Sequence, residues 1–223
     1  MDKRYLTLLR NSILNLLFPP VCLHCGERIT RQDDFICQTC FAKIEFLDPV
    51  ITKIEGLSYD YLISIAKYRE VIVSIIHNLK FYDFSSISDF IAELMYKPIR
   101  KLKLLLDENI LIDVPLHPIR KKERGYNQAS LISYRLANLL DCEYHNDVLV
   151  RVSNTISQAT LKHEARAGNM EQAFRLNKDI DFNNKTIILL DDVFTTGSTV
   201  EECCKALRET NPKRIIVLTL GKA

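Results

Sequence analysis

Several features are missing from this chain, and each absence narrows its class. The 223 residues contain no apolar run near the roughly 20 residues that a membrane-spanning helix needs. The apolar stretch near the start is interrupted by Arg10, Asn11 and Asn15 and lacks a small-residue cleavage site, unlike a secretory signal. Neither charge dominates, because 30 Lys and Arg stand against 28 Asp and Glu. We therefore expect a soluble, cytoplasmic protein whose bulk charge does not indicate nucleic-acid binding.

What is present indicates a folded protein of modest size. The chain is 47% hydrophobic and 26% charged, close to the averages of globular proteins, and its length allows one domain plus an appendage. Residues 5–18 place apolar side chains at helical spacing before Pro19 and Pro20, which indicates a short amphipathic helix. We expect this N-terminal helix at 1–20, a cysteine-rich module at 21–49 and a main domain at 50–223.

Four of the seven cysteines form two Cys-x2-Cys pairs separated by eleven residues: Cys22, Cys25, Cys37 and Cys40. Two such pairs can close a tetrahedral shell of four thiolates, which Zn²⁺ prefers, and four protein ligands leave no open position for catalysis. Redox pairs or unligated buried thiols are the alternative, but neither pair lies in a strand–helix–strand context. We expect one structural zinc ion per chain, with Cys142, Cys203 and Cys204 in the core.

The main domain alternates short apolar strands with amphipathic helices. Strands are expected at 59–68, 110–114, 148–152, 186–190 and 215–220. Helices are expected at 71–79, 86–104, 128–140 and 199–209. Such alternation is typical of an α/β fold with a parallel sheet covered on both faces. A polar stretch at 153–180 is long for a connection and indicates a functional loop.

Residues 187–199 carry the strongest signal for a ligand. A buried apolar strand runs into Asp191 and Asp192, then into a hydroxyl-rich turn and a helix. Open α/β sheets bind ligands at the carboxyl ends of their strands. Backbone N–H groups at a helix N-terminus, with nearby hydroxyls, suit a phosphate monoester. The residues available for this are Thr195, Thr196, Gly197, Ser198 and Thr199.

The two carboxylates suit sugar hydroxyls and would repel a phosphate, so the pattern predicts a ligand with a hydroxyl-bearing body and a phosphate tail. An acid pair also occurs where Mg²⁺ is held for phosphorylation of an aspartate, and Ser/Thr-rich turns are common helix caps. Neither alternative accounts for the whole segment. The chain has no GxxxxGK[ST] loop of the Walker type.

The same segment resembles the phosphoribosyl-pyrophosphate (PRPP) signature of type I phosphoribosyltransferases. In that family two acids hold the ribose 2′ and 3′ hydroxyls and the following loop holds the 5′-phosphate. The resemblance implies the first role for Asp191 and Asp192. It implies the second for Thr195, Thr196, Gly197, Ser198 and Thr199. It also implies Mg²⁺ bound together with PRPP.

Motifs elsewhere resemble the ComF competence family over nearly the whole chain. They lie at 17–22, 115–118, 123–128, 154–158 and 219–220, together with the two cysteine pairs. The resemblance implies a type I phosphoribosyltransferase fold, a parallel sheet flanked by helices, preceded by a small zinc-knuckle module. It further implies a role in natural transformation, where imported DNA is handled with a helicase-like partner protein.

Residues 116–128 form a basic loop. By resemblance, this is where type I enzymes bind pyrophosphate, which implies contacts from Leu116, His117, Arg124 and Gly125. Arg120, Lys121 and Lys122 could instead form a solvated charge run, or bind single-stranded DNA with Tyr126 as a stacking platform. By resemblance, the polar stretch at 153–180 corresponds to a flexible loop that closes over the reacting centre in type I enzymes. His163 there is a general-base candidate or a surface histidine.

These observations leave two functional hypotheses. In the first, the chain is a phosphoribosyltransferase that uses PRPP and Mg²⁺, with Asp191 and Asp192 at the catalytic centre and an acceptor that no motif names. In the second, it is a non-catalytic adaptor that binds PRPP or single-stranded DNA and engages competence partners through the zinc module and the basic loops. Release of pyrophosphate separates the two.

Overall fold

The structure, a computed structural model, describes most of the chain outside its N-terminal segment. The described residues are 19–29, 35–48, 54–79, 84–100, 102, 108–116, 122, 127–152, 173–177 and 179–223. The helix expected at 5–18 lies outside them. None of the described helices is long and apolar enough to cross a membrane.

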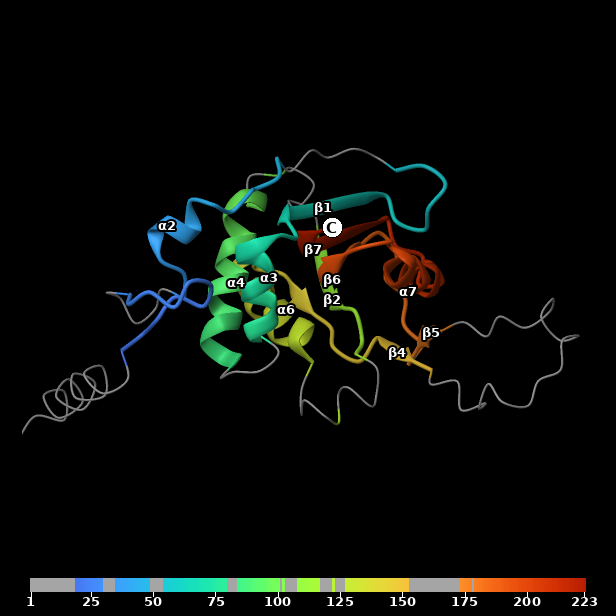
Figure 1. The fold of residues 1–223 in the computed structure, drawn as a ribbon. Coiled ribbons are helices and arrows are strands. Elements are labelled where there is room, and N and C mark those ends of the chain that lie inside the picture. The colour runs from blue at the N-terminus through green and yellow to red at the C-terminus, as the bar shows by residue number, and fades with distance from the viewer. Residues whose placement is uncertain are drawn as a thin grey trace, which may run out of the picture.

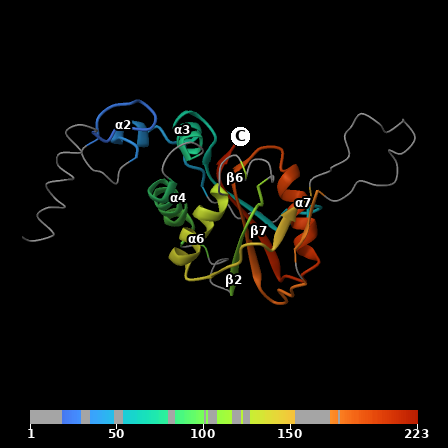
Figure 2. The ribbon, with the colours of Figure 1, turned by 90° about the horizontal axis from the view of Figure 1, so that it is seen from below.

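A five-stranded parallel sheet organises the main domain, in the strand order β1-β7-β6-β2-β3. Its strands are β1 (Tyr61–Lys67), β2 (Asn109–Asp113), β3 (Glu143–Tyr144), β6 (Thr186–Phe194) and β7 (Arg214–Lys222). Helices α3 (Glu70–Leu79), α4 (Phe84–Ile99) and α6 (Gln128–Leu140) cover one face, and α7 (Ser198–Arg208) covers the other (Figures 1 and 2). The predicted parallel sheet with helices on both faces is confirmed.

The apolar runs in the central strands follow from this layering. Successive side chains of a strand point to opposite faces. In β6, Ile188 and Leu190 join the cluster formed with α3, α4 and α6, whereas Ile187 and Leu189 join the cluster formed with α7. Because both faces are covered, the four positions 187–190 of β6 are all apolar, and the polar residues Thr186, Asp191 and Asp192 flank this run.

Three elements differ from the sequence prediction. The strand expected at 148–152 is β4 (Leu149–Arg151), which pairs antiparallel with β5 (Phe174–Leu176) in a separate two-stranded sheet. The helix expected at 86–104 ends at Ile99. β6 continues to Phe194 instead of ending at Leu190, because β7 runs beside it in unbroken register and supplies hydrogen-bond partners.

The cysteine-rich module packs against α3 and α4, on the side away from α7 (Figures 1 and 2). His24 Nδ1 lies 2.9 Å from Ser74 Oγ of α3. The rings of Phe35 and Phe90 of α4 are 5.7 Å apart between centroids. Buried residues of the module, Cys40 among them, belong to the same cluster as the inner faces of α3 and α4. The module therefore shares its core with the main domain.

The last residues of this module also cover the outer edge of the sheet. Leu47 N–H donates to Ile65 O at 2.9 Å, and Lys67 N–H donates to Glu45 O at 2.9 Å. Phe46 forms an antiparallel bridge with Ala66. Because β1 is an edge strand, residues 45–47 occupy hydrogen-bonding groups that would otherwise face solvent.

Candidate functional site

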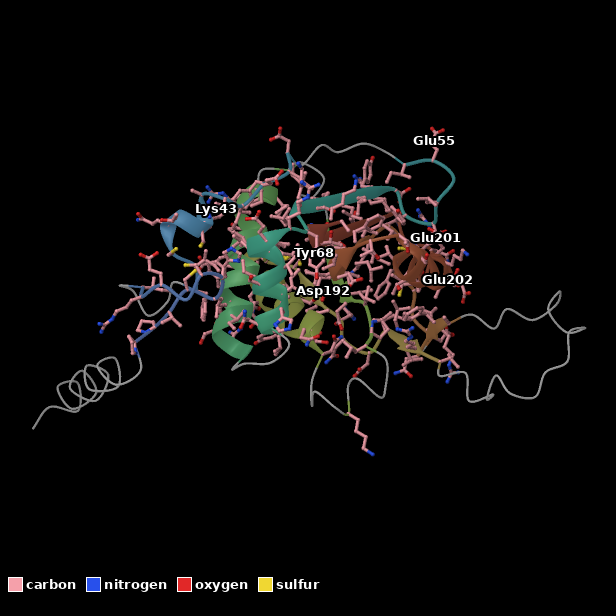
Figure 3. The ribbon with its side chains drawn as sticks, viewed as in Figure 1. Lys43, Glu55, Tyr68, Asp192, Glu201 and Glu202 are labelled. Carbon is pink, nitrogen blue, oxygen red and sulfur yellow. The ribbon has the colours of Figure 1, made fainter. Side chains whose placement is uncertain are left out.

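The acid pair lies within β6, near the carboxyl edge of the sheet. Asp191 and Asp192 are both half-buried, and as neighbours in a strand they point to opposite faces. Asp191 follows Ile187 and Leu189 at two-residue steps and so lies on the α7 side of the sheet. Burial raises the pKa of the Cys203 thiol on α7, and the nearby charges of Cys204 and Asp191 add to the rise. The N–H of Asp192 donates to Asp191 Oδ1 at 2.9 Å and so orients that carboxylate. Figure 3 shows Asp192 and Tyr68 near this edge.

The turn after β6 requires glycine at its last position. Gly197 has φ 78°, in the left-handed region, and a Cβ added there would lie 2.7 Å from Phe194 Cζ. Gly197 is the N-cap of α7 and supplies no side-chain acceptor to the first N–H groups of the helix. Those N–H groups and the exposed hydroxyls beside them suit a phosphate group. The exposed hydroxyl residues are Thr195, Thr196, Ser198 and Thr199.

A row of polar side chains crosses the sheet beside the acid pair. Ser64 of β1, Thr219 of β7 and Asp191 of β6 are paired in register across three strands. Ser64 Oγ lies 2.8 Å from Thr219 Oγ1, and both side chains are buried. The sequence motif at 219–220 included Thr219, whereas a single serine in a strand gives no signal, so Ser64 was missed.

The start of the basic loop emerges beside the same edge. Val114 N–H donates to Leu190 O at 3.0 Å, which carries the pairing of β2 with β6 up to the acid pair. Leu116 follows and lines a cavity of about 240 Å³ together with Arg151 of β4. Lys122 is exposed. The other predicted residues of this loop, His117, Arg120, Lys121, Arg124, Gly125 and Tyr126, lie outside the described residues, as does His163.

The four cysteines of the module come together as predicted. Their Sγ atoms all lie within 4.8 Å of one another. Cys25 Sγ and Cys37 Sγ are 3.8 Å apart. A tetrahedral ZnS₄ centre with Zn–S bonds of about 2.3 Å has edges of about 3.8 Å, so the spacing fits zinc.

The thiols of the quartet differ in how readily they ionise. Burial opposes ionisation of Cys22, but backbone N–H groups of Cys25, Cys37 and His24 outweigh it and lower the Cys22 pKa to about 6. Burial and the neighbouring thiols raise the Cys40 pKa to about 12. A divalent cation must therefore displace protons from this site to gather four thiolates.

Comparisons with known proteins agree with the two parts of the fold. The family model for the phosphoribosyl transferase domain matches residues 122–222. The model for the double zinc ribbon domain matches residues 13–56, which include the four cysteines. The fold is thus of the phosphoribosyltransferase type, with a structural zinc site in the N-terminal module.

Relatives define the family more closely. Competence protein F of Haemophilus influenzae is 34% identical over 210 residues, which cover 92% of this chain and 85% of that protein. The DNA utilization protein YhgH of Escherichia coli K12 is 30% identical over 193 residues, 84% of this chain and 83% of that protein. A hypoxanthine phosphoribosyltransferase structure from Staphylococcus aureus, 13% identical with a TM-score of 0.38, covers 66% of this chain and 71% of its own. This chain belongs to the ComF competence family.

Proposed function

We propose that this chain binds PRPP together with Mg²⁺ at the carboxyl edge of its sheet and transfers the ribose 5-phosphate group to an acceptor. The observation that carries the proposal is the junction of β6 and α7. There, two carboxylates are followed, after the four residues 193–196, by a glycine-capped helix N-terminus. Acceptors for sugar hydroxyls and donors for a phosphate therefore lie in the order that a ribose 5-phosphate requires.

The proposed reaction is a displacement at C1 of the ribose. A lone pair of the acceptor forms the new bond to C1, the C1–O bond breaks, and pyrophosphate leaves with that electron pair while the acceptor loses a proton. Asp191 and Asp192 hold the ribose hydroxyls from the two faces of β6, and the α7 N-terminus holds the 5′-phosphate. Mg²⁺ bound with the substrate would neutralise charge on the leaving pyrophosphate.

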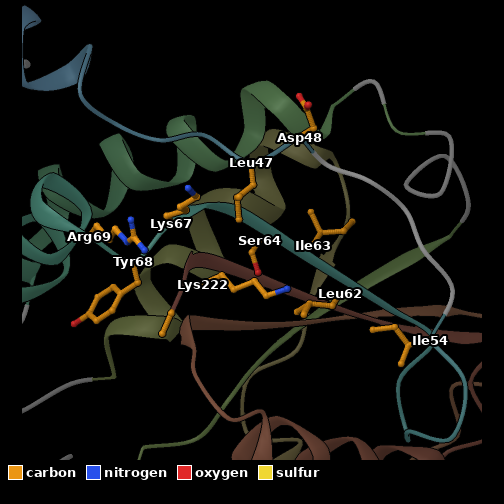
Figure 4. Close-up of a pocket in the computed structure, with 11 residues that line it drawn as sticks. Leu47, Asp48, Ile54, Leu62, Ile63, Ser64, Lys67, Tyr68, Arg69 and Lys222 are labelled. Carbon is orange, nitrogen blue, oxygen red and sulfur yellow. The ribbon is translucent and has the colours of Figure 1, made fainter.

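A second cavity beside this edge gives an acceptor room. It measures about 540 Å³, and Figure 4 shows Ser64, Lys222 and Leu62 among its lining residues. Ser64 stands two strand spacings from Asp191, about 10 Å at 4.8 Å per strand. Lys222 pairs with Phe194, the residue before Thr195 of the phosphate loop. A group bound beside Ser64 would lie about 10 Å from Asp191, which supports the presence of room for an acceptor at this edge.

Binding and turnover test the proposal. With Mg²⁺, the double variant Asp191→Asn/Asp192→Asn is expected to bind PRPP at least 10-fold more weakly by calorimetry, because an amide is a poorer acceptor for two ribose hydroxyls than a carboxylate. The exposed Asp179→Asn serves as a matched control and should bind like wild type. Pyrophosphate release with candidate bases or amines should follow the same ranking. Equal release by wild type and double variant would exclude the catalytic role.

We also propose that the chain acts in competence and DNA utilisation, in the cytoplasm. Its relatives are named as competence and DNA utilization proteins, and their matches cover 92% and 84% of this chain, which supports the proposal. Expressed in a host that lacks its own copy, wild type should restore transformation, whereas Asp191→Asn/Asp192→Asn should restore at least 10-fold less. Full restoration by the double variant would favour the adaptor, which works through single-stranded DNA or a helicase-like partner.

A further inference from the structure

A buried polar cluster lies where the basic loop joins the sheet. Its centre is Asp113, the last residue of β2, whose side chain is 9% exposed. Three donors converge on its carboxylate. Asn127 Nδ2 reaches Oδ2 at 2.6 Å, Ser130 Oγ reaches Oδ2 at 2.7 Å, and Tyr144 OH reaches Oδ1 at 2.7 Å. We call these four residues the stem cluster.

Asn127 is the residue that ties both ends of the loop together. Besides its bond to Asp113, its Nδ2 lies 3.2 Å from Val114 O, at the point where the chain leaves β2. Its Oδ1 accepts the Ala129 N–H at 3.3 Å and so caps α6, where the chain resumes. One amide therefore fixes the end of the strand, the start of the helix and the distance between them.

The cluster destabilises the fold if any of its hydrogen bonds is missing, because the Asp113 carboxylate is buried. Burial raises the pKa of the Asp113 carboxyl, and bonds from Ser130 and Tyr144 offset part of the rise. Burial, together with the Asp113 charge, also raises the Tyr144 pKa, which keeps its hydroxyl protonated as a donor. A buried carboxylate that loses a donor loses stability, so the cluster resists rearrangement.

We propose that Asp113 and Asn127 are positioning residues for the pyrophosphate end of the substrate. The proposal rests on the proposed function, since it concerns the same site. The cluster holds the segment from Val114 to Leu116 against the edge of the sheet beside Asp191. Ligand groups held by the α7 N-terminus depend on β6 and α7 instead. Asp113 pairs with Leu190 of β6 through the backbone of β2, but the side-chain hydrogen bonds of the cluster join β2 to α6 and β3. Loosening the stem should therefore affect one end of the ligand only.

Two probes that represent the two ends separate this role from a general loss of structure. Ribose 5-phosphate reports on the acid pair and the phosphate loop, and magnesium pyrophosphate reports on the other end. Asn127→Ala is expected to weaken pyrophosphate binding at least 10-fold by calorimetry while ribose 5-phosphate binding changes less than 2-fold. Ser130→Ala, which removes one donor of three and leaves the α6 cap intact, should show the same split at about 3-fold.

Ser133→Ala is the matched control, because Ser133 is buried on the same helix but belongs to no bond of the cluster. It should leave both affinities unchanged. Circular dichroism and zinc content verify the fold of each variant, and Ser130→Ala decides the question if Asn127→Ala does not fold. Equal loss of both probes, or loss of neither, would overturn the positioning role. Failure of wild type to bind either probe would instead refute the proposed function.

Discussion

Cys40→Ser is expected to release the zinc ion and to destabilise the whole chain. Cys40 is 2% exposed and sits in the cluster that includes α3 and α4, so the loss of its thiolate reaches the main domain. Structural zinc contributes about 10–16 kcal/mol of binding free energy in zinc-finger peptides. The free energy of unfolding of a whole domain is usually about 5–15 kcal/mol, so loss of the zinc ion removes a comparable amount. We expect zinc content to fall from about one ion per chain to near zero and the melting temperature to fall by more than about 10 °C.

Elemental analysis and thermal unfolding measure these two effects. Cys142→Ser is the control, because it removes a half-buried thiol that lies outside the quartet. The Cys142→Ser protein should keep its zinc ion. Acidification should mimic Cys40→Ser, because protons compete for the thiolates and the Cys40 pKa, raised to about 12, makes its thiolate the hardest to form. A Cys40→Ser protein that kept a full zinc complement would show that the ligand set is wrong.

Gly197→Val is expected to abolish ribose 5-phosphate binding, with a loss of at least 100-fold. A β-branched residue is disfavoured at a left-handed φ, and the new Cβ would lie 2.7 Å from the Phe194 ring. The Phe194 ring can turn away from the new Cβ, but the backbone strain can be relieved only by a shift of the turn, which moves the α7 N–H groups away from the phosphate. Strain of this kind also costs about 1–3 kcal/mol in stability.

Gly56→Val is a close control for this substitution. Gly56 also has a positive φ, at 82°, but among the described residues no atom would lie within 4 Å of an added Cβ. It should therefore show the stability cost of the backbone conformation without the loss of phosphate binding. Calorimetric titration with ribose 5-phosphate and urea unfolding separate the two effects. Similar affinities for the two variants would mean that the turn after β6 does not hold the phosphate.

Features that depend on neighbouring residues could be predicted from the sequence. The cysteine pairs, the acid pair and the hydroxyl-rich turn each occupy a few neighbouring positions, so the gathering of the four cysteines and the place of the acids and the turn between a strand and a helix could be predicted. The apolar run at 187–190 and the helix at 128–140 were likewise recognisable, because burial on two faces or on one leaves a regular pattern.

Features that depend on distant partners could not be predicted. Ser64 belongs to the polar row only because its hydroxyl contacts Thr219, which is 155 positions away in the sequence. In the sequence, Asp113 is one polar residue at the end of a strand. Only the fold brings Asn127 and Tyr144 within hydrogen-bonding distance of its carboxylate. β4 has the apolar character of a central strand, yet it pairs with β5 outside the main sheet. β6 runs through the acid pair because β7 continues beside it, which composition alone does not reveal.

The pairing of residues 45–47 with β1 connects the zinc module to the outer edge of the sheet. The segment that follows the zinc-binding cysteines shields the outer strand of the sheet. If the module comes apart for want of zinc, that strand offers its unpaired backbone groups to other chains, a common route to aggregation. In zinc-depleted cells we then expect this protein to aggregate. The resulting loss of activity would come from the loss of folded protein and not from damage to the phosphate site.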